Sequence, residues 1–197
     1  LAFPTDSFRY KVTVNVETPD GLKSGFAVRE FTVMQQPEVG DSGPANWVNG
    51  EAVVVDLGDR GVLFAVIDPD DEYVVFRTFK IEGGLTHEGM SQYERLEAKA
   101  VVDPLNYPLL VAFKDIEDPK TVTVAYRPLR ERDTDKQGMQ YKVVGVEDNM
   151  AELFGGGVLF KDIIVEMTDE PVTQGKAKKF LPEFNQDYWD WFSALDY

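Results

Sequence analysis

The 197-residue chain contains no cysteine, and this absence excludes disulfide bonds, thiolate metal sites and cysteine nucleophiles. Histidine is almost missing too, because His87 is the only one. A histidine-based triad needs a nucleophile and an orienting acid around it, and the sequence carries no local motif of that kind. We therefore expect His87 to be an exposed loop residue rather than a catalytic base.

Long apolar runs and a basic charge excess are also lacking. The longest apolar runs, such as residues 62–67, are far too short to cross a bilayer. The 35 Asp and Glu residues outnumber the 20 Lys and Arg residues, giving a formal net charge of -15. Because this charge opposes approach to phosphate backbones and anionic lipid surfaces, we expect no nucleic-acid partner.

Nucleotide-binding fingerprints are absent although glycines cluster twice. Neither Gly83 and Gly84 nor the glycines at 155–157 match a P-loop or a dinucleotide-binding pattern, since the required lysine or glycine spacing is missing. These glycines are therefore predicted to form turns and to end a helix.

What the sequence does contain is the composition and alternation of a single β-rich domain. Hydrophobic residues make up 43% and charged residues 28%, as in globular proteins. Apolar and polar residues alternate over residues 8–17, which predicts a strand with one buried face, and Pro19, Asp20 and Gly21 predict a tight turn after it. In the next segment the apolar parity changes around residues 29–30, so either a β-bulge lies there or the strand is buried on different faces along its length.

Further strands follow from apolar and β-branched runs. Residues 52–55 and 62–67 predict a hairpin at the centre of the sheet. Additional strands are predicted over residues 73–79, 109–113, 121–126 and 158–168, the last with Leu159, Ile163, Val165 and Met167 on one side. The polar stretch 130–139 is predicted to be an exposed hairpin loop.

Two short helices are also expected. Ser91 and Glu94 have the spacing of a capping box, which predicts a helix near residues 92–98, and Asp148 is a potential N-cap for a helix ended by the glycines at 155–157. Together these patterns predict a mainly β fold, an antiparallel β-sandwich or barrel-like sheet of about eight to ten strands with two or three short helices.

One acidic turn is a candidate for a metal site. Hard oxygen ligands concentrate in a short stretch, which would suit Ca²⁺ if backbone carbonyls completed the shell. The stretch lacks the length and spacing of an EF-hand loop, and acidic turn residues also arise for local reasons. The candidate calcium ligands are Asp68, Asp70, Asp71 and Glu72.

The C-terminal segment has the most unusual composition. Residues 180–197 contain seven aromatic residues and four acids but no basic residue, and their spacing predicts a short amphipathic helix. We divide the chain into a β-rich globular domain, residues 1–179, and this acidic aromatic segment, residues 180–197. The aromatic face either docks on the protein's own sheet or anchors a protein partner. The candidate partner-binding residues are Phe184, Tyr188, Trp189, Trp191 and Phe192.

Four stretches, residues 13–21, 50–57, 107–115 and 168–173, together resemble a family of small, uncharacterised bacterial cell-envelope proteins. The resemblance implies an export or anchoring segment ahead of Leu1, which itself looks like the start of a processed chain, and hence a periplasmic or membrane-anchored location. It brings no activity and no catalytic residues. The loop at 130–139 and the aromatic segment depart from the family pattern.

These observations favour an envelope-associated interaction or structural domain without catalytic activity, cofactor or catalytic residues. One alternative is a carboxylate-based hydrolase or carbohydrate-acting enzyme on a β-sandwich, although no carboxylate pair stands out in so acidic a chain. Another alternative is a small-ligand carrier, which requires an apolar cavity inside the sheet.

Overall fold

The computed structural model describes residues 3–35, 44–67, 73–134, 140–181, and this part of the chain forms two antiparallel sheets of five strands each. The first sheet has the order β3-β2-β1-β10-β6 and the second the order β4-β5-β7-β8-β9. The strands are β1 (Thr5–Thr18), β2 (Gly21–Met34), β3 (Ala45–Asn49), β4 (Val53–Asp56), β5 (Val62–Ala65), β6 (Lys99–Val101), β7 (Leu110–Phe113), β8 (Val122–Arg132), β9 (Tyr141–Asp148) and β10 (Leu159–Met167). The helices are α1 (Val74–Phe79), α2 (His87–Glu94) and α3 (Met150–Phe154), with 3₁₀ turns η1 (Gly58–Arg60), η3 (Pro104–Asn106), η4 (Pro119–Thr121) and η5 (Ala177–Lys179).

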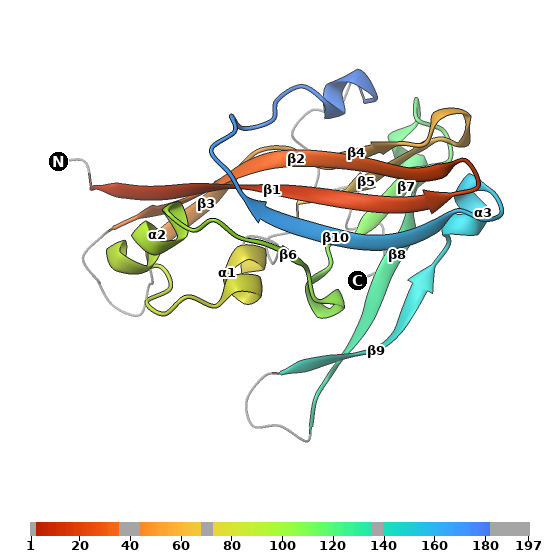
Figure 1. Cartoon of the computed structure of the whole chain (residues 1–197). Coiled ribbons are helices and arrows are strands. Elements are labelled where there is room, and N and C mark those ends of the chain that lie inside the picture. The colour runs from red at the N-terminus through yellow and green to blue at the C-terminus, as the bar shows by residue number, and fades with distance from the viewer. Residues whose placement is uncertain (1–2, 36–43, 68–72, 135–139, 182–197) are drawn as a thin grey trace.

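The main hydrophobic core lies between the two sheets, and α1 and α2 close one end of it (Figure 1). Both sheets contribute, for example through Val14 of β1 and Leu63 of β5, each fully buried. The two sheets remain separate in the described residues and do not close into a barrel. The predicted mainly β, antiparallel, sandwich-like fold is therefore confirmed.

Strand β1 follows its predicted alternation. Its inward side chains are buried, and each buried aliphatic or aromatic side chain contributes about 1.5–3 kcal/mol to the hydrophobic term. The buried set is Phe8, Tyr10, Val12, Val14 and Val16. The turn at residues 19–20 joins β1 to β2 as predicted, with the hydroxyl oxygen of Thr18 accepting the Asp20 N–H at 3.2 Å.

Strand β2 contains no bulge, and it is buried on its core face and, over part of its length, on its other face as well. Its register with β1 is continuous from Thr18 opposite Gly21 to Thr5 opposite Met34, so the second of the two alternatives is correct. Phe31 points into the core, whereas Val28 lies on the other face and is 1% exposed. The segment after β10 returns to β2 there, because the Thr173 N–H donates to the Val28 carbonyl at 3.0 Å.

The strand predicted over residues 73–79 is wrong, because these residues form helix α1. The helix brings neighbouring apolar side chains to one aromatic cluster, which alternation along a strand would separate. The Phe76 ring lies 5.0 Å from that of Phe31 and 4.7 Å from that of Tyr93, and Val74 and Val75 are buried. Tertiary packing thus overrides the strand propensity of a β-branched run.

The helix predicted near residues 92–98 lies earlier in the chain, as α2. Its N-cap is Thr86, whose hydroxyl accepts the Gly89 N–H at 3.2 Å, so Ser91 does not form the expected cap. Residues 95–98 leave the helix because the Ala98 carbonyl accepts the Met167 N–H at 2.9 Å, which leads the chain into β6.

Three further predictions are refined. Strand β4 lies at the edge of the second sheet rather than at a sheet centre. In β10 a register shift opposite Asn15 and Val16 turns Leu159 outwards, where it is 51% exposed, while Ile163 and Val165 stay buried. Helix α3 occurs as expected and ends at a glycine, but its N-cap is Asn149 rather than the predicted Asp148. An Asp148 carboxylate oxygen still accepts the Met150 N–H at 3.0 Å.

Candidate functional site

Both site predictions made from the sequence lie outside the described residues. The partner-binding residues Phe184, Tyr188, Trp189, Trp191 and Phe192 belong to the range 182–197, and the calcium candidate Asp68, Asp70, Asp71 and Glu72 to the range 68–72. Within the described ranges, no group of three or more His, Asp or Glu side chains is placed to hold a metal ion.

The last described residues, 180 and 181, lie at the outer face of the second sheet. Leu181 is buried there and Phe180 packs beside it, in a cluster with Phe64 and Val111. The segment before them is tied to Glu51, whose carboxylate accepts the backbone N–H groups at residues 176 and 177 at 2.9 and 3.3 Å. The C-terminal aromatic segment therefore begins next to an apolar sheet face.

The Lys176 ammonium group in this segment lies 3.5 Å from the centre of the Phe26 ring. Burial lowers the pKa of Lys176, which Glu51 partly offsets. This lysine fixes the segment against the outer face of β2.

His87 is exposed as expected but opens a helix instead of lying in a loop, and the clustered glycines form turns and a helix end as expected. The His87 side chain is 81% exposed, although it opens α2 rather than lying in a loop, and its Nδ1 lies 2.8 Å from an Asp6 carboxylate oxygen. Gly83 and Gly84 have positive φ values of 90° and 49°, which only glycine adopts readily, and Gly155 ends α3. These positions serve turns and helix ends.

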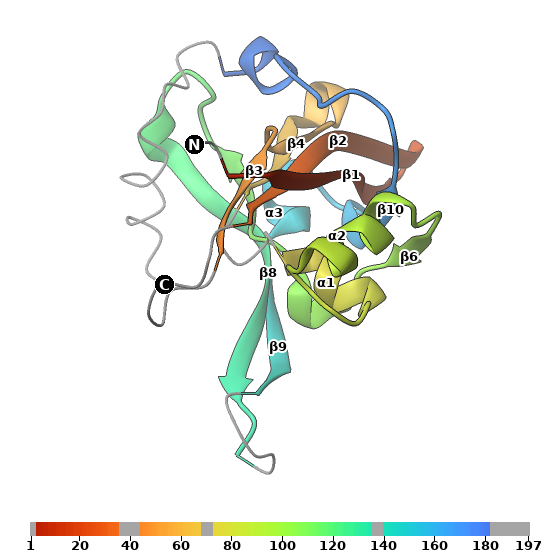
Figure 2. The same cartoon turned by 90° about the vertical axis from the view of Figure 1, so that its left-hand side faces the viewer.

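The most conspicuous exposed feature is the β8–β9 ribbon, which we define as residues 126–132 of β8 and 141–148 of β9. It projects away from the packed sheets in both views (Figure 1, Figure 2). Five of its large apolar side chains are exposed, from 37% for Val143 to 52% for Val144. The exposed set is Leu129, Tyr141, Val143, Val144 and Val146.

Polar contacts hold the β8–β9 ribbon in shape. Arg130 anchors it to the η3 region, since its guanidinium donates to the carbonyls of Leu105 at 2.8 Å and Tyr107 at 2.6 Å. Two ion pairs cross between the strands, Arg127 with Glu147 at 2.7 Å and Lys142 with Glu131 at 3.5 Å. The exposed apolar side chains are thus presented on an ordered support.

Two tyrosines at the base of the ribbon have raised pKa values. Burial raises the pKa of Tyr126, and the carboxylate of Asp148 raises it further. Burial also raises the pKa of Tyr107, with a smaller contribution from Asp162. Both phenols therefore stay neutral in the physiological range, and the apolar base of the ribbon carries no phenolate charge.

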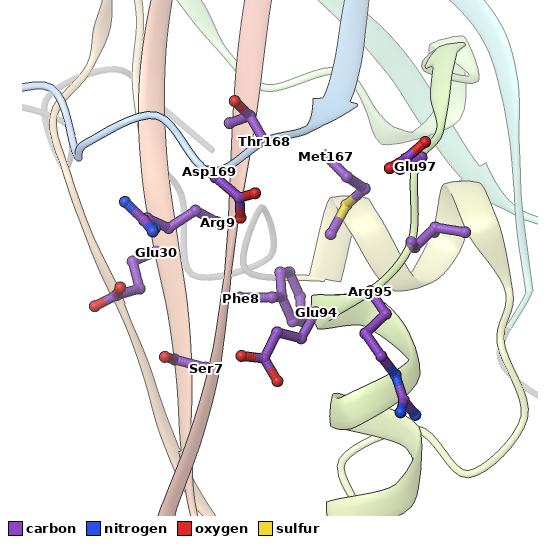
Figure 3. A pocket seen from close by; sticks show the side chains of 11 residues that line it. Ser7, Phe8, Arg9, Glu30, Glu94, Arg95, Glu97, Met167, Thr168 and Asp169 are labelled. Carbon is purple, nitrogen blue, oxygen red and sulfur yellow. The ribbon is translucent and has the colours of Figure 1, made fainter.

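A second feature is a polar hollow of about 420 Å³ beside the N-terminal half of β1 (Figure 3). It lies between β1, the residues that follow α2 and the residues that follow β10. Glu94 and Asp169 approach it from opposite sides, while the side chain of Arg95 points away from β1. Its lining residues are Ser7, Phe8, Arg9, Glu30, Glu94, Arg95, Leu96, Glu97, Met167, Thr168 and Asp169.

A third feature is a buried cation on the inner face of β2. Arg29 is 2% exposed, its Nε donates to the Glu51 carbonyl at 3.3 Å, and its Nη2 has no hydrogen-bond partner in the part of the chain that the structure describes. Gly50 makes room for it, because a Cβ there would lie 2.8 Å from Arg29 Cγ. A buried guanidinium without a carboxylate partner among the described residues costs folding free energy.

Sequence reasoning missed the ribbon as a surface. It placed an exposed loop at residues 130–139, whereas β8 continues through Arg132 and β9 begins at Tyr141. The available signal was Val143, Val144 and Val146, a β-branched run beside a highly polar stretch, which is unusual for an edge strand.

Comparison of the chain with protein-family models, curated proteins and solved structures found no match in any of the three. Among the described residues, none of the helices has the length and apolar character needed to span a membrane.

Proposed function

We propose that this chain is a non-catalytic interaction domain of the bacterial cell envelope and that the β8–β9 ribbon is its contact surface. The observation that carries the proposal is the exposure of five large apolar side chains on one projecting ribbon. The envelope location rests on the sequence resemblance.

Physical chemistry supports a contact role for such a surface. Large apolar side chains exposed to water cost free energy, and groups of them on a soluble protein mark interaction sites. The ribbon also ends its sheet, and backbone groups at a sheet edge pair readily with another strand. Tyr141 adds the type of residue that dominates binding hot spots.

The substitution Val144→Asp tests this contact surface. We expect it to reduce partner capture from a native envelope extract by about tenfold or more, because binding would bury an unpaired carboxylate. Quantitative mass spectrometry of the captured proteins is the measurement. Val101→Asp is the matched control, since Val101 is 57% exposed on edge strand β6 of the other sheet and Val144 is 52% exposed. Equal capture by wild type and Val144→Asp would contradict the proposal.

The acidic aromatic segment is a second proposed contact of the same domain. Removal of residues 182–197, which keeps the packed Phe180 and Leu181, allows it to be assessed separately in the same capture experiment. Unchanged unfolding with loss of a captured protein supports recruitment by this segment. A lowered unfolding midpoint with unchanged capture supports docking on the protein's own sheet.

The polar hollow favours a second candidate function, a carboxylate-based hydrolase or carbohydrate-acting enzyme. Its volume of about 420 Å³ falls within the range of ligand sites, and Glu94 and Asp169 border it. For this function, an oligosaccharide panel should contain a sugar that raises the unfolding midpoint of wild type but not of Glu94→Gln. The matched control is Glu88→Gln, on the same helix but outside the lining of the hollow. A panel without any such sugar would count against this candidate.

A further inference from the structure

We propose that the outer edge of β9 pairs with the same edge of a second copy, around a two-fold axis between Val144 and Gly145, and joins two five-stranded sheets into one. This inference rests on the proposed contact function of the ribbon and names its partner. Three independent features of β9 support it: the direction of its free backbone groups, the position of its bulge and the order of its charges.

The first feature is the direction of the backbone groups along β9. The Asn149 N–H donates to the Ala125 carbonyl at 2.9 Å, and the Asp133 N–H donates to the Gln140 carbonyl at 2.7 Å. Because bonded and non-bonded pairs alternate in an antiparallel ladder, these two bonds fix which residues point their N–H and carbonyl groups away from β8. The outward residues are Tyr141 and Val143 on one side of the bulge, and Val146 and Asp148 on the other.

Pro128 agrees with this assignment. It lies opposite Val146 and has no N–H to donate, as expected for a non-bonded pair. The Val146 N–H therefore points to the free edge, where no strand among the described residues pairs with it.

The second feature is the bulge. Leu129 lies opposite Gly145, but the next residue of β8 lies opposite Val143, so Val144 is the extra residue. Because of the bulge, the backbone N–H and carbonyl groups that point away from β8 belong to odd-numbered residues before it, 141 and 143, and to even-numbered residues after it, 146 and 148. A regular strand keeps one parity and cannot match both halves of this edge.

A second copy of β9 does match both halves. When the strands run antiparallel around the proposed axis, Val143 faces Val146 of the second copy and Tyr141 faces its Asp148. In all four of these residues the backbone N–H and carbonyl groups point away from β8, so they can bond to the second copy, and the two bulges lie opposite each other. The bulge, which would block most edge pairing, thus selects for self-pairing.

The third feature is the charge order. The same register places Lys142 opposite Glu147 of the second copy. Each side chain already has an oppositely charged neighbour on β8, Glu131 for Lys142 and Arg127 for Glu147. Across the four strands the charges then alternate on one face: Arg127 and Glu147 of one copy are followed by Lys142 and Glu131 of the second copy. Opposite charges that face each other across neighbouring strands are stabilising.

Net charge does not oppose this contact. The whole chain carries -15, but residues 126–148 contain five basic and five acidic residues and so have no net charge. Two acidic bodies thus meet through a ribbon that, together with its connecting loop, has no net charge, and the distance between the bodies weakens their repulsion at physiological salt.

Sedimentation equilibrium of the intact chain at high micromolar to millimolar concentration tests the pairing. Wild type is expected to dimerise. Lys142→Glu and Glu147→Lys are each expected to weaken dimerisation about tenfold or more, because like charges then face each other twice. An equimolar mixture of the two variants is expected to form a heterodimer, since each carries the charge that the other needs at both contacts.

The matched control is Lys161→Glu. Lys161 is 45% exposed in an ion pair with Glu17, and Lys142 is 45% exposed in an ion pair with Glu131, but Lys161 lies on β10 in the other sheet. This variant is expected to dimerise like wild type. Val146→Pro, which removes an outward N–H without touching the ladder to β8, is expected to be monomeric with native circular dichroism.

A monomeric wild type, a dimer insensitive to both charge reversals, or a mixture that forms no heterodimer would each overturn the inference. If wild type is monomeric but Val144→Asp no longer captures some other protein that wild type captures, self-pairing is rejected and the proposed contact function stands. A heterodimer in the mixture combined with unchanged capture by Val144→Asp supports self-pairing and rejects binding of a different protein by the ribbon.

Discussion

Gly25→Ala is expected to lower the free energy of unfolding by about 3 kcal/mol or more, although it adds a single methyl group. Gly25 lies on β2 directly against the backbone of β4 in the other sheet. A Cβ at this position would lie 1.9 Å from the carbonyl oxygen of Val54 and 2.6 Å from its carbonyl carbon. Because the obstacle is the backbone of β4, no side-chain rotation relieves it, and the sheets must separate. Chemical denaturation followed by circular dichroism measures the effect.

Gly156→Ala is the control for this substitution. A Cβ there meets nothing within 4 Å, and Gly156 does not have a positive φ. The expected change is within about 0.5 kcal/mol. If Gly25→Ala unfolds at the same denaturant concentration as Gly156→Ala, the close approach of β2 and β4 does not occur in solution.

Phe8→Ala is expected to lower the free energy of unfolding by about 3–5 kcal/mol, through lost burial and the cavity that remains. Phe8 is 3% exposed, and its ring lies 5.5 Å from that of Phe31, 5.6 Å from that of Phe76 and 5.3 Å from that of Tyr93. It thereby joins β1 and β2 to both α1 and α2. Denaturation measures the loss, and hydrogen exchange should show α1 and α2 losing protection first.

Phe3→Ala removes the same side chain from a position that is 44% exposed, and it should leave stability within about 0.5 kcal/mol of wild type. Protection of α1 and α2 that is unchanged in Phe8→Ala would mean that the aromatic cluster does not hold these helices.

Local pattern was sufficient wherever one strand face was buried along its whole length. The alternation over residues 8–17 fixed both the type and the inward face of β1, and the proline and glycine of the following turn placed the hairpin. The strand prediction for residues 73–79 failed because an apolar, β-branched run is compatible with either a strand or a buried helix. Only the packing of Phe76 against Phe31 and Tyr93 decides between them.

The candidate sites depended more heavily on contacts distant in sequence. The residues that line the polar hollow come from β1, from the end of α2 and from the segment after β10, so no local motif could reveal it. The ribbon was only partly visible, since an exposed hairpin loop was predicted at residues 130–139 but the valines that follow it were not assigned to an exposed strand. Exposure depends on which strands lie beside β9, and periodicity does not encode that.

By itself the sequence determined the chemistry that is excluded and the class of fold. The absence of cysteine and of nucleotide-binding motifs is a property of the residues present, and the two-residue alternation follows from strand geometry without reference to any partner. Tertiary structure alone decided that β9 ends its sheet, that a bulge reverses the parity of its free edge, and that Lys142 and Glu147 occupy complementary positions along it. The reason is that strand order and register arise from pairing between distant segments, and a surface exists only once that pairing leaves an edge uncovered.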